Sequence, residues 1–285
     1  MKILNFGSLN IDYVYSVDHF VQKGETISSS QMNIFSGGKG LNQSTALGRA
    51  GAQVFHAGRI GKGGEFLVEQ LKEAGVNTDL VVLDSQCSTG HAIIQNDAEG
   101  DNCILLYGGA NQRITKEQID ATLDQFDAGD YLVLQNETSN LPYLMEKAAE
   151  KQMKIVLNPS PMDEKIKALP LDKVTLFFVN EIEAAAAFRS MFPQAAVVLT
   201  LGSQGSVYID KDQVIPQKCY KVKAVDTTAA GDTFTGFFVS AISKGKSPKE
   251  ALDLASRASA IAVSRPGAAP SVPTLDEVEN WEFAE

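Results

Sequence analysis

The sequence has few cysteines and no arrangement of them that would build a cross-link or a metal site. Its 285 residues include three cysteines, Cys87, Cys103 and Cys219, which are widely spaced and form no Cys-x-x-Cys pair. Neither a disulfide framework nor a zinc site is indicated. The first residues, MKILNFGSLNIDY, alternate like a strand and lack the long apolar core of a signal peptide. We therefore expect a protein of the reducing cytoplasm.

Positive charge and long apolar runs are also scarce. The 25 Lys and Arg residues are outnumbered by 35 Asp and Glu residues, which gives a formal net charge of −10. Nucleic acids and anionic membranes are bound through faces rich in Lys and Arg, so the composition argues against both partners. The sequence contains no run of 18 apolar residues, which argues against a membrane-spanning helix. An anionic substrate would need a local positive site.

The chain alternates short apolar strands with helices. Strands are expected near 2–8, 53–61, 81–83, 131–137, 154–161, 175–181, 196–206 and 205–210, and helices near 36–51, 64–75, 115–126, 141–152, 233–244 and 248–264. This alternation predicts an α/β fold with a doubly wound, mostly parallel sheet, and we expect residues 1–285 to form one domain. Two hairpin-like insertions, at about 12–35 and 88–107, interrupt the alternation. We expect them to pair into a small β lid beside the sheet.

Polar residues follow several predicted strands at the point where each strand ends. They are Asn10, Asp12, the segment 37–42, Glu137, Asn180, Glu183 and the segment 202–205. Ligands of open α/β sheets bind at the carboxyl ends of the strands, so these residues are candidates for one shared site. Individually, Asn10 and Asp12 are also typical turn formers, and Asn180 with Glu183 could form a capping box.

The segment 226–237, DTTAAGDTFTGF, places two aspartates around small residues and then continues into an apolar helix. A helix that starts just after Gly231 exposes the backbone N–H groups of Ala229, Ala230, Gly231 and Asp232, which together form an anion hole. Asp232 at this helix start can accept a proton from an attacking hydroxyl while the amides hold a transferring phosphoryl group. An aspartate suffices as the base because phosphoryl transfer has a loose transition state. The alternative is that these residues only cap the helix.

The standard nucleotide motifs are missing. GGKG at 37–40 has no Ser or Thr after the Lys and no Gly at the required distance before it, so it is not a Walker loop. GRIGKGGEF at 58–66 does not match G-x-G-x-x-G, which leaves a dinucleotide site with little support. His19, His56 and His91 lack metal-ligand spacing and are interpreted as structural or surface residues.

Taken together, the motifs resemble those of the ribokinase-like (PfkB) carbohydrate kinases. The resemblance rests on GSLNID (7–12), SGGKGLNQ (36–43), the Glu that ends LVLQNE (137), NEIE (180–183), TLGSQGS (200–206), DTTAAGDTF (226–234) and the tail AIAVSRPGAAPSVP (260–273). It spans nearly the whole chain in the right order, and the tail favours the ribose kinases of the family. It implies ATP-dependent phosphorylation of the primary hydroxyl of D-ribose.

The resemblance also implies a role for each matching residue. Asp232 matches the catalytic base and Ala229, Ala230 and Gly231 the anion hole. The positions that hydrogen-bond the sugar are matched by Asn10, Asp12, Gly38, Lys39, Asn42 and Glu137. Asn180 and Glu183 match the motif that organises Mg²⁺ through water. Thr200, Gly202 and Gly205 match the nucleotide loop, with Ser256 near the adenine. Asp226, Thr228, Ala262, Arg265, Gly267 and Ser271 match the loops that bind an activating monovalent cation, usually K⁺, several of them through backbone carbonyls.

The family further implies a homodimer that forms through the lid. The chain departs from the family between NEIEAAAAF and VVLTL, where RSMFPQAA replaces a longer helical connection and trims the nucleotide side.

Three alternative functions remain. The protein could be a family kinase for another ketose, a deoxysugar or a nucleoside, or a catalytically silent sugar-binding relative. The third, a nicotinamide-dependent oxidoreductase on a doubly wound sheet, lacks the dinucleotide fingerprint.

Overall fold

The computed structural model describes residues 1–99 and 101–283, except for the side chains of Ile182 and Glu183. Its largest element is a nine-stranded sheet in which the seven strands from β11 to β5 run parallel and two strands at one edge, β12 and β13, are antiparallel. The strands lie in the order β13 (Val214–Gln217), β12 (Ser206–Ile209), β11 (Ala196–Thr200), β10 (Val174–Val179), β9 (Lys154–Asn158), β8 (Tyr131–Gln135), β1 (Ile3–Phe6), β4 (Val54–Lys62) and β5 (Asn77–Ser88). The predicted doubly wound, mostly parallel sheet is confirmed.

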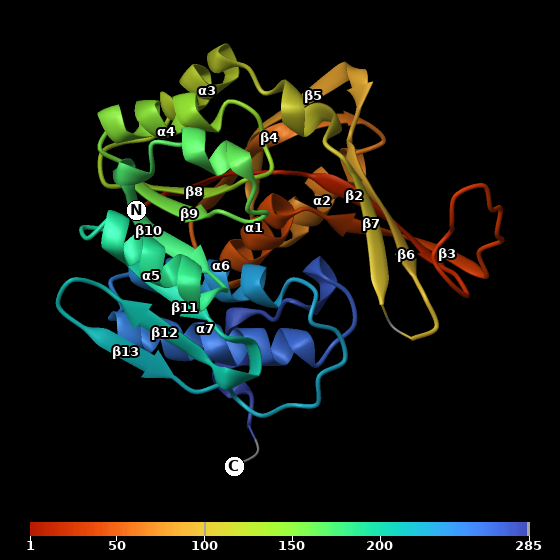
Figure 1. The fold of residues 1–285 in the computed structure, drawn as a ribbon. Coiled ribbons are helices and arrows are strands. Elements are labelled where there is room, and N and C mark those ends of the chain that lie inside the picture. The colour runs from red at the N-terminus through yellow and green to blue at the C-terminus, as the bar shows by residue number, and fades with distance from the viewer. Residues whose placement is uncertain (100, 284–285) are drawn as a thin grey trace.

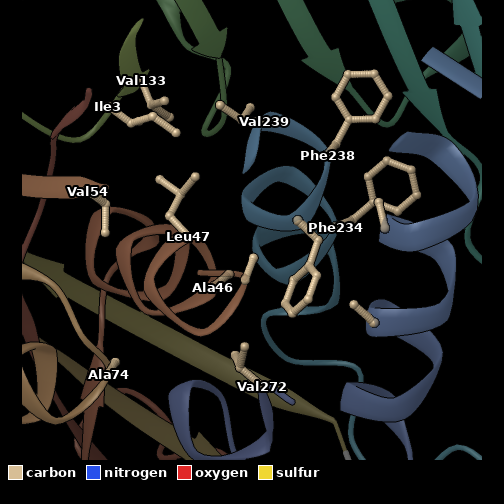
Figure 2. Close-up of a cluster of buried hydrophobic side chains, with 14 of the residues drawn as sticks. Ile3, Ala46, Leu47, Val54, Ala74, Val133, Phe234, Phe238, Val239 and Val272 are labelled. Carbon is tan, nitrogen blue, oxygen red and sulfur yellow. The ribbon is translucent and has the colours of Figure 1, made fainter. Parts of the chain in front are cut away.

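Helices cover both faces of this sheet (Figure 1). One face carries α1 (Lys39–Arg49), α2 (Glu65–Glu73), α6 (Ala230–Ser243), α7 (Pro248–Val263) and α8 (Leu275–Asn280). The other carries α3 (Lys116–Leu123), α4 (Leu141–Glu150) and α5 (Ile182–Met191). Because successive side chains of a strand point to opposite faces, Ile3 belongs to the first core and Leu4 to the second. Figure 2 shows Leu47 of α1 and Val239 of α6 lying beside Ile3 and Val133 of the sheet.

The two hairpin-like segments form a separate four-stranded sheet that extends away from the main one (Figure 1). Its order is β3 (Gln31–Gly37), β2 (Asn10–Ser16), β6 (Gly90–Asn96) and β7 (Asn102–Tyr107). The pairs β2–β3 and β6–β7 are antiparallel, and β2 pairs with β6 in parallel. The first residue of β2 is Asn10, which follows directly on the turn at the end of β1. This junction joins the four-stranded sheet to the carboxyl edge of the main sheet.

Three elements, α5, β13 and α8, were not among the predicted helices and strands. α5 fills the connection between β10 and β11, where the alanine-rich segment 184–187 carries little periodic signal. β13 contains a proline, and α8 has six residues, so neither has a strong sequence pattern. None of the helices in the described part of the chain combines the length and apolar composition that crossing a membrane requires.

Candidate active site

A cavity of about 230 Å³ lies at the carboxyl edge of the main sheet. Its walls come from the ends of β9, β10 and β11, from the start of α1, and from the segment that leads into α6. The lining residues are Lys39, Asn158, Ser160, Phe178, Val179, Asn180, Thr200, Thr227, Ala229, Ala230, Gly231, Asp232 and Thr235. Seven of them were predicted as site residues. The other six were not: Asn158, Ser160, Phe178, Val179, Thr227 and Thr235. Asn158 and Ser160 belong to the NPSP segment, which follows β9 at the same edge as the predicted residues.

The start of α6 presents free backbone N–H groups to this cavity. Ala229 is the N-cap residue, with φ at 60°, and no side chain caps the helix. Within the part of the chain that the structure describes, the N–H groups of Ala229, Gly231 and Asp232 have no acceptor, whereas Ala230 donates to the Thr227 carbonyl at 3.2 Å. Three of the four predicted donors are therefore available to an anion. The capping alternative is wrong, because Asp232 makes its hydrogen bonds elsewhere.

The left-handed conformation of Ala229 is unusual for a residue with a Cβ atom, and such strain occurs mainly at functional sites. It turns the chain into the helix so that Gly231 faces open space, since a Cβ atom built there would meet no protein atom within 4 Å. This leaves room for a ligand group directly above the helix start.

The carboxylate of Asp232 is 7% exposed and is held by two side chains of α1. Its Oδ2 accepts a hydrogen bond from Asn42 Nδ2 at 3.0 Å, and its Oδ1 accepts one from Gln43 Nε2 at 2.9 Å. The two helices can approach this closely because position 236, one turn beyond Asp232, is a glycine. A Cβ atom there would lie 2.4 Å from the Cβ of Ala46, one turn beyond Asn42. Gln43 was not predicted as a site residue.

Glu137 forms a second carboxylate, partly buried, on the segment that follows β8 and beside the start of α1. Its Oε2 accepts hydrogen bonds from the backbone N–H of Lys39, at 2.9 Å, and from Ser8 Oγ. Burial raises the pKa of Glu137, against the lowering effect of these donors. Ser8, which was not predicted, also accepts a hydrogen bond from the Gly40 N–H at 3.2 Å. The ends of β1 and β8 and the start of α1 are thus tied together at this carboxylate.

Asn10 and Asp12 project from β2. Asn10 Oδ1 accepts a hydrogen bond from Asn111 Nδ2 at 2.8 Å, and Asn111 Oδ1 accepts one from the Leu9 N–H at 3.0 Å. Asn111 is buried and was missed by the sequence analysis, which assigned no element to the loop that contains it. Asp12 lies over Gly37, where a Cβ atom would be 2.1 Å from its Oδ2. Burial, with the nearby charge of Glu137, raises the pKa of Asp12 to about 6.

Beside Asn10 and Asp12, Gly38 has a φ of 92°, and a Cβ atom there would lie 3.0 Å from Ser8 Oγ. Gly38 is also the N-cap residue of α1.

The predicted nucleotide loop is a turn between β11 and β12. Gly202 and Gly205 have φ angles of 56° and 98°, and Leu201 N–H donates to the Gly205 carbonyl at 2.8 Å. Thr200 precedes this turn and lines the cavity. Ser256 is buried in α7, and none of the residues lining the cavity in the described chain comes from that helix. The structure therefore does not bring Ser256 to the cavity.

Of the two residues predicted to organise Mg²⁺, Asn180 lines the cavity and Glu183 lies in the helix that follows it. Asn180 lines the cavity and precedes α5, whose N-cap is Glu181 without a side-chain cap, so the capping-box alternative is wrong. Glu183 lies in the first turn of α5, and its side chain is outside the described residues. No three His, Cys, Asp or Glu side chains gather around a metal position elsewhere in the described chain.

The predicted monovalent-cation loops lie side by side. The N–H groups of Val225 and Asp226 both donate to the Val263 carbonyl, at 2.7 and 3.2 Å. Asp226 accepts hydrogen bonds from the N–H groups of Thr228, at 2.8 Å, and Gly267, at 2.9 Å. Burial acts to raise the pKa of Asp226, but these donors lower it, so the carboxylate remains ionised.

Three further members of the predicted cation set have their own partners. The Ala262 carbonyl accepts a hydrogen bond from the Arg265 N–H at 3.1 Å, and the Arg265 side chain pairs with Glu277 at 2.7 Å. Ser271 Oγ donates to the Ala268 carbonyl at 2.8 Å. The ligands on offer are therefore carbonyl and carboxylate oxygens, a set that suits a hard cation.

Comparisons with known proteins agree with the motifs. The family model for pfkB family carbohydrate kinases matches residues 1–275. A ribokinase of Staphylococcus aureus is 35% identical over 303 aligned positions, covering 97% of this chain and 98% of the relative. The crystal structure of a Cryptococcus neoformans ribokinase in complex with ADP has a TM-score of 0.84 at 31% identity and covers 98% of both chains. That of Arabidopsis thaliana ribokinase complexed with ribose and ATP has a TM-score of 0.86 at 27% identity, covering 98% of this chain and 97% of that one.

Proposed function

Because the chain belongs to the pfkB family of carbohydrate kinases, we propose that it transfers the γ-phosphoryl group of ATP to the primary hydroxyl of D-ribose, giving ribose 5-phosphate. The ribokinases that match it over nearly their whole length support ribose as the sugar, and the bound ADP and ATP of its structural relatives support the nucleotide. The observation that carries the chemistry is the oriented carboxylate of Asp232 beside three free N–H groups at one cavity.

Asp232 acts as the general base in this proposal. The sugar O–H bond breaks and its proton moves to the carboxylate, the sugar oxygen forms a bond to the γ-phosphorus, and the bond between that phosphorus and the β–γ bridging oxygen breaks to release ADP. The N–H groups of Ala229, Gly231 and Asp232 hold the transferring group at the positive end of α6. They stabilise the charge that spreads over the phosphoryl oxygens as the bond breaks. Positioning and electrostatics thus supply most of the acceleration.

The sugar lies between the four-stranded sheet and the start of α1. Asn10, Asp12 and Glu137 offer oxygen acceptors for its hydroxyls, and Asn42, Lys39 and the Gly38 backbone surround the reacting end. Buried or partly buried acceptors of this kind reject an analogue that lacks a hydroxyl, because one of them would then lose its partner. We infer that the four-stranded sheet closes over the sugar as a lid.

ATP occupies the cavity, with its phosphates at the start of α6. Thr200, Gly202 and Gly205 border the nucleotide. Asn180 and Glu183 would hold Mg²⁺ through water, and the ion would neutralise charge on the phosphates. Ser256 lies near the adenine by family resemblance alone. The paired loops with Asp226, Thr228, Ala262, Arg265, Gly267 and Ser271 would hold K⁺, and the cation would stabilise the loop leading into the anion hole.

The same four-stranded sheet also forms a homodimer contact in this proposal. It exposes the apolar side chains of Met32, Ile34, Phe35, Ile93, Ile104, Leu105, Leu106 and Tyr107. Exposed apolar patches of this kind mark contact surfaces. Sedimentation analysis should give a dimer for the purified protein and a monomer when Ile104 and Leu106 are replaced by Asp. We place the enzyme in the cytoplasm.

The test of the proposed function is coupled ADP release with ATP, Mg²⁺ and K⁺ across ribose, deoxyribose, fructose, other sugars and adenosine. We expect strong turnover with ribose. Turnover with one of the other compounds but not with ribose would support phosphoryl transfer and show that the substrate is not ribose. Ligand binding without ADP release would show a silent sugar-binding relative instead.

A further inference from the structure

A row of fully buried amide side chains runs from Asp232 into the protein behind it. Asp232 Oδ1 accepts a hydrogen bond from Gln43 Nε2 at 2.9 Å, and Gln43 Oε1 accepts one from Gln135 Nε2 at 2.7 Å. Gln135 Nε2 also donates to Asn5 Oδ1 at 2.9 Å. The exposed fractions of Gln43, Gln135 and Asn5 are 0%, 1% and 0%. None of the three can therefore reach a ligand, although the row ends at the candidate base.

The far end of the row is anchored in the core between the sheet and α1. Asn5 Nδ2 donates to the Gly40 carbonyl and to Ser44 Oγ, both at 2.8 Å, and Ser44 Oγ lies 2.7 Å from His56 Nδ1. Burial lowers the pKa of His56 to about 3, so its ring stays neutral and Nδ1 can accept the Ser44 hydroxyl proton. Each group in the row is thus held by the next one.

The chemistry of the groups allows only one direction of hydrogen-bond donation along the row. A carboxylate only accepts hydrogen bonds, so Gln43 must turn its NH₂ group toward Asp232. Its oxygen then faces Gln135, which must in turn present an NH₂ group. That NH₂ group serves both Gln43 and Asn5. The orientation of the Gln43 amide is therefore fixed by residues of β1 and β8 that do not touch Asp232.

The two oxygens of Asp232 are held differently. Oδ2 is bonded by Asn42, whose own Oδ1 is buried without a partner in the described structure and which borders the proposed sugar site. The Oδ1 atom of Asn42 can therefore accept a hydrogen bond from a sugar hydroxyl, which places Oδ2 of Asp232 on the sugar side of the carboxylate. Gln43 has no such alternative, since its oxygen and its NH₂ group are both engaged inside the protein. Burying such polar groups costs free energy that apolar packing would not, which argues for a role beyond stability.

We propose that Gln43 is a positioning residue that fixes Oδ1 of Asp232, so that Oδ2 is the oxygen that receives the sugar proton. Gln135 and Asn5 support it by keeping its amide in the donating orientation. This inference rests on the proposed function, in which Asp232 is the base.

The test compares the isosteric variants Gln43→Met and Gln135→Met with the wild-type enzyme. Gln43→Met removes the donor to Oδ1, and kcat with ribose should fall by about ten- to a hundredfold, while KM for ribose and for ATP stays within about twofold. Gln135→Met frees the Gln43 amide without touching Asp232, and kcat should fall by about three- to tenfold. Gln118→Met is the matched control. Gln118 is also buried, but it bonds the Gly58 carbonyl and Arg59, away from Asp232, so kcat should not change.

A folded Gln43→Met enzyme with wild-type kcat, or a loss confined to KM, would overturn the inference. So would an equal loss of kcat in Gln118→Met. If Gln43→Met does not fold, Gln135→Met decides by the same criteria. A crystal structure of the folded variant separates this inference from the proposed function, because it needs no turnover: a rotated Asp232 carboxylate supports the inference, and an unchanged one contradicts it. If the wild-type enzyme phosphorylates no sugar, the proposed function fails and the crystal structure still decides the role of Gln43.

Discussion

Lowering the pH from 7 to 5 is expected to weaken ribose binding by about tenfold, because a partly buried carboxylate at the sugar site becomes protonated. Burial and the neighbouring charge of Glu137 raise the pKa of Asp12 to about 6. At pH 5 only about one tenth of Asp12 is then ionised. The ionised form makes the stronger, charge-assisted hydrogen bonds to hydroxyls, so the affinity should follow the ionised fraction. Burial also raises the pKa of Glu137 above its ordinary value.

The assay is calorimetric titration of the enzyme with ribose, without ATP, between pH 4.5 and 8. Leaving ATP out matters because its own phosphates titrate in this range. Repeating the titration in buffers with different ionisation enthalpies counts the protons exchanged, and we expect binding below pH 6 to release protons from Asp12. In Glu137→Gln the like charge is gone, so the acid limb should move to lower pH, although burial still holds it above the ordinary range of an aspartate.

Asp12→Asn is the matched control, since it keeps the shape of the side chain and cannot ionise. Its ribose affinity should be lower at pH 7 and should lose the part of the acid limb that belongs to Asp12. An affinity for ribose that is constant from pH 7 to pH 5 in the wild-type enzyme would refute the reasoning. An unchanged acid limb in Asp12→Asn would refute the assignment to this residue.

Three further predictions concern the glycines around the base and the stability of the fold. Gly231→Ala should lower kcat by about a hundredfold or more, since its methyl group would enter the anion hole, yet leave the melting temperature unchanged because no protein atom lies within 4 Å. Gly236→Ala should lower the free energy of unfolding in urea by about 1–3 kcal/mol and reduce kcat, because its Cβ would lie 2.4 Å from the Cβ of Ala46. The raised pKa of Asp12 means that its contribution to stability is complete below pH 4 and is lost as the pH rises through about 6. Asp12→Asn should therefore be more stable than the wild-type protein at pH 7, by up to about 3 kcal/mol, and this gain should shrink toward pH 4.

The sequence indicated the main sheet because its central strands, such as β1 and β8, are fully buried and mostly apolar. It also indicated where the site lies. The polar residues that follow β8, β10 and β11 meet at one edge because parallel strands end together, as Asn180 and Thr200 do at the cavity. The segment 226–237 predicted the start of α6 because small residues and an aspartate precede a strongly apolar helix.

The partners of these residues were less accessible to sequence analysis. Gln43 lies 189 positions from Asp232, and nothing in the pattern of α1 distinguishes it from an ordinary helical glutamine. Asn111 and Ser8 likewise act through contacts with distant segments, at separations of 101 and 129 positions. Only the packing of α1 against α6 brings Gln43 to the base. The available signal was two adjacent amides, Asn42 and Gln43, on a helix of small buried residues, where buried amides need partners.

The most direct test of the account is the turnover of Asp232→Asn compared with its ribose affinity. Asparagine keeps the size of the side chain but cannot take the proton, so kcat should fall by at least about a thousandfold. Calorimetry should give a ribose affinity close to that of the wild-type enzyme, because the hydroxyls still meet Asn10, Asp12 and Glu137. A folded Asp232→Asn enzyme with near-normal kcat would contradict the assignment of Asp232 as the base, and with it the proposed mechanism.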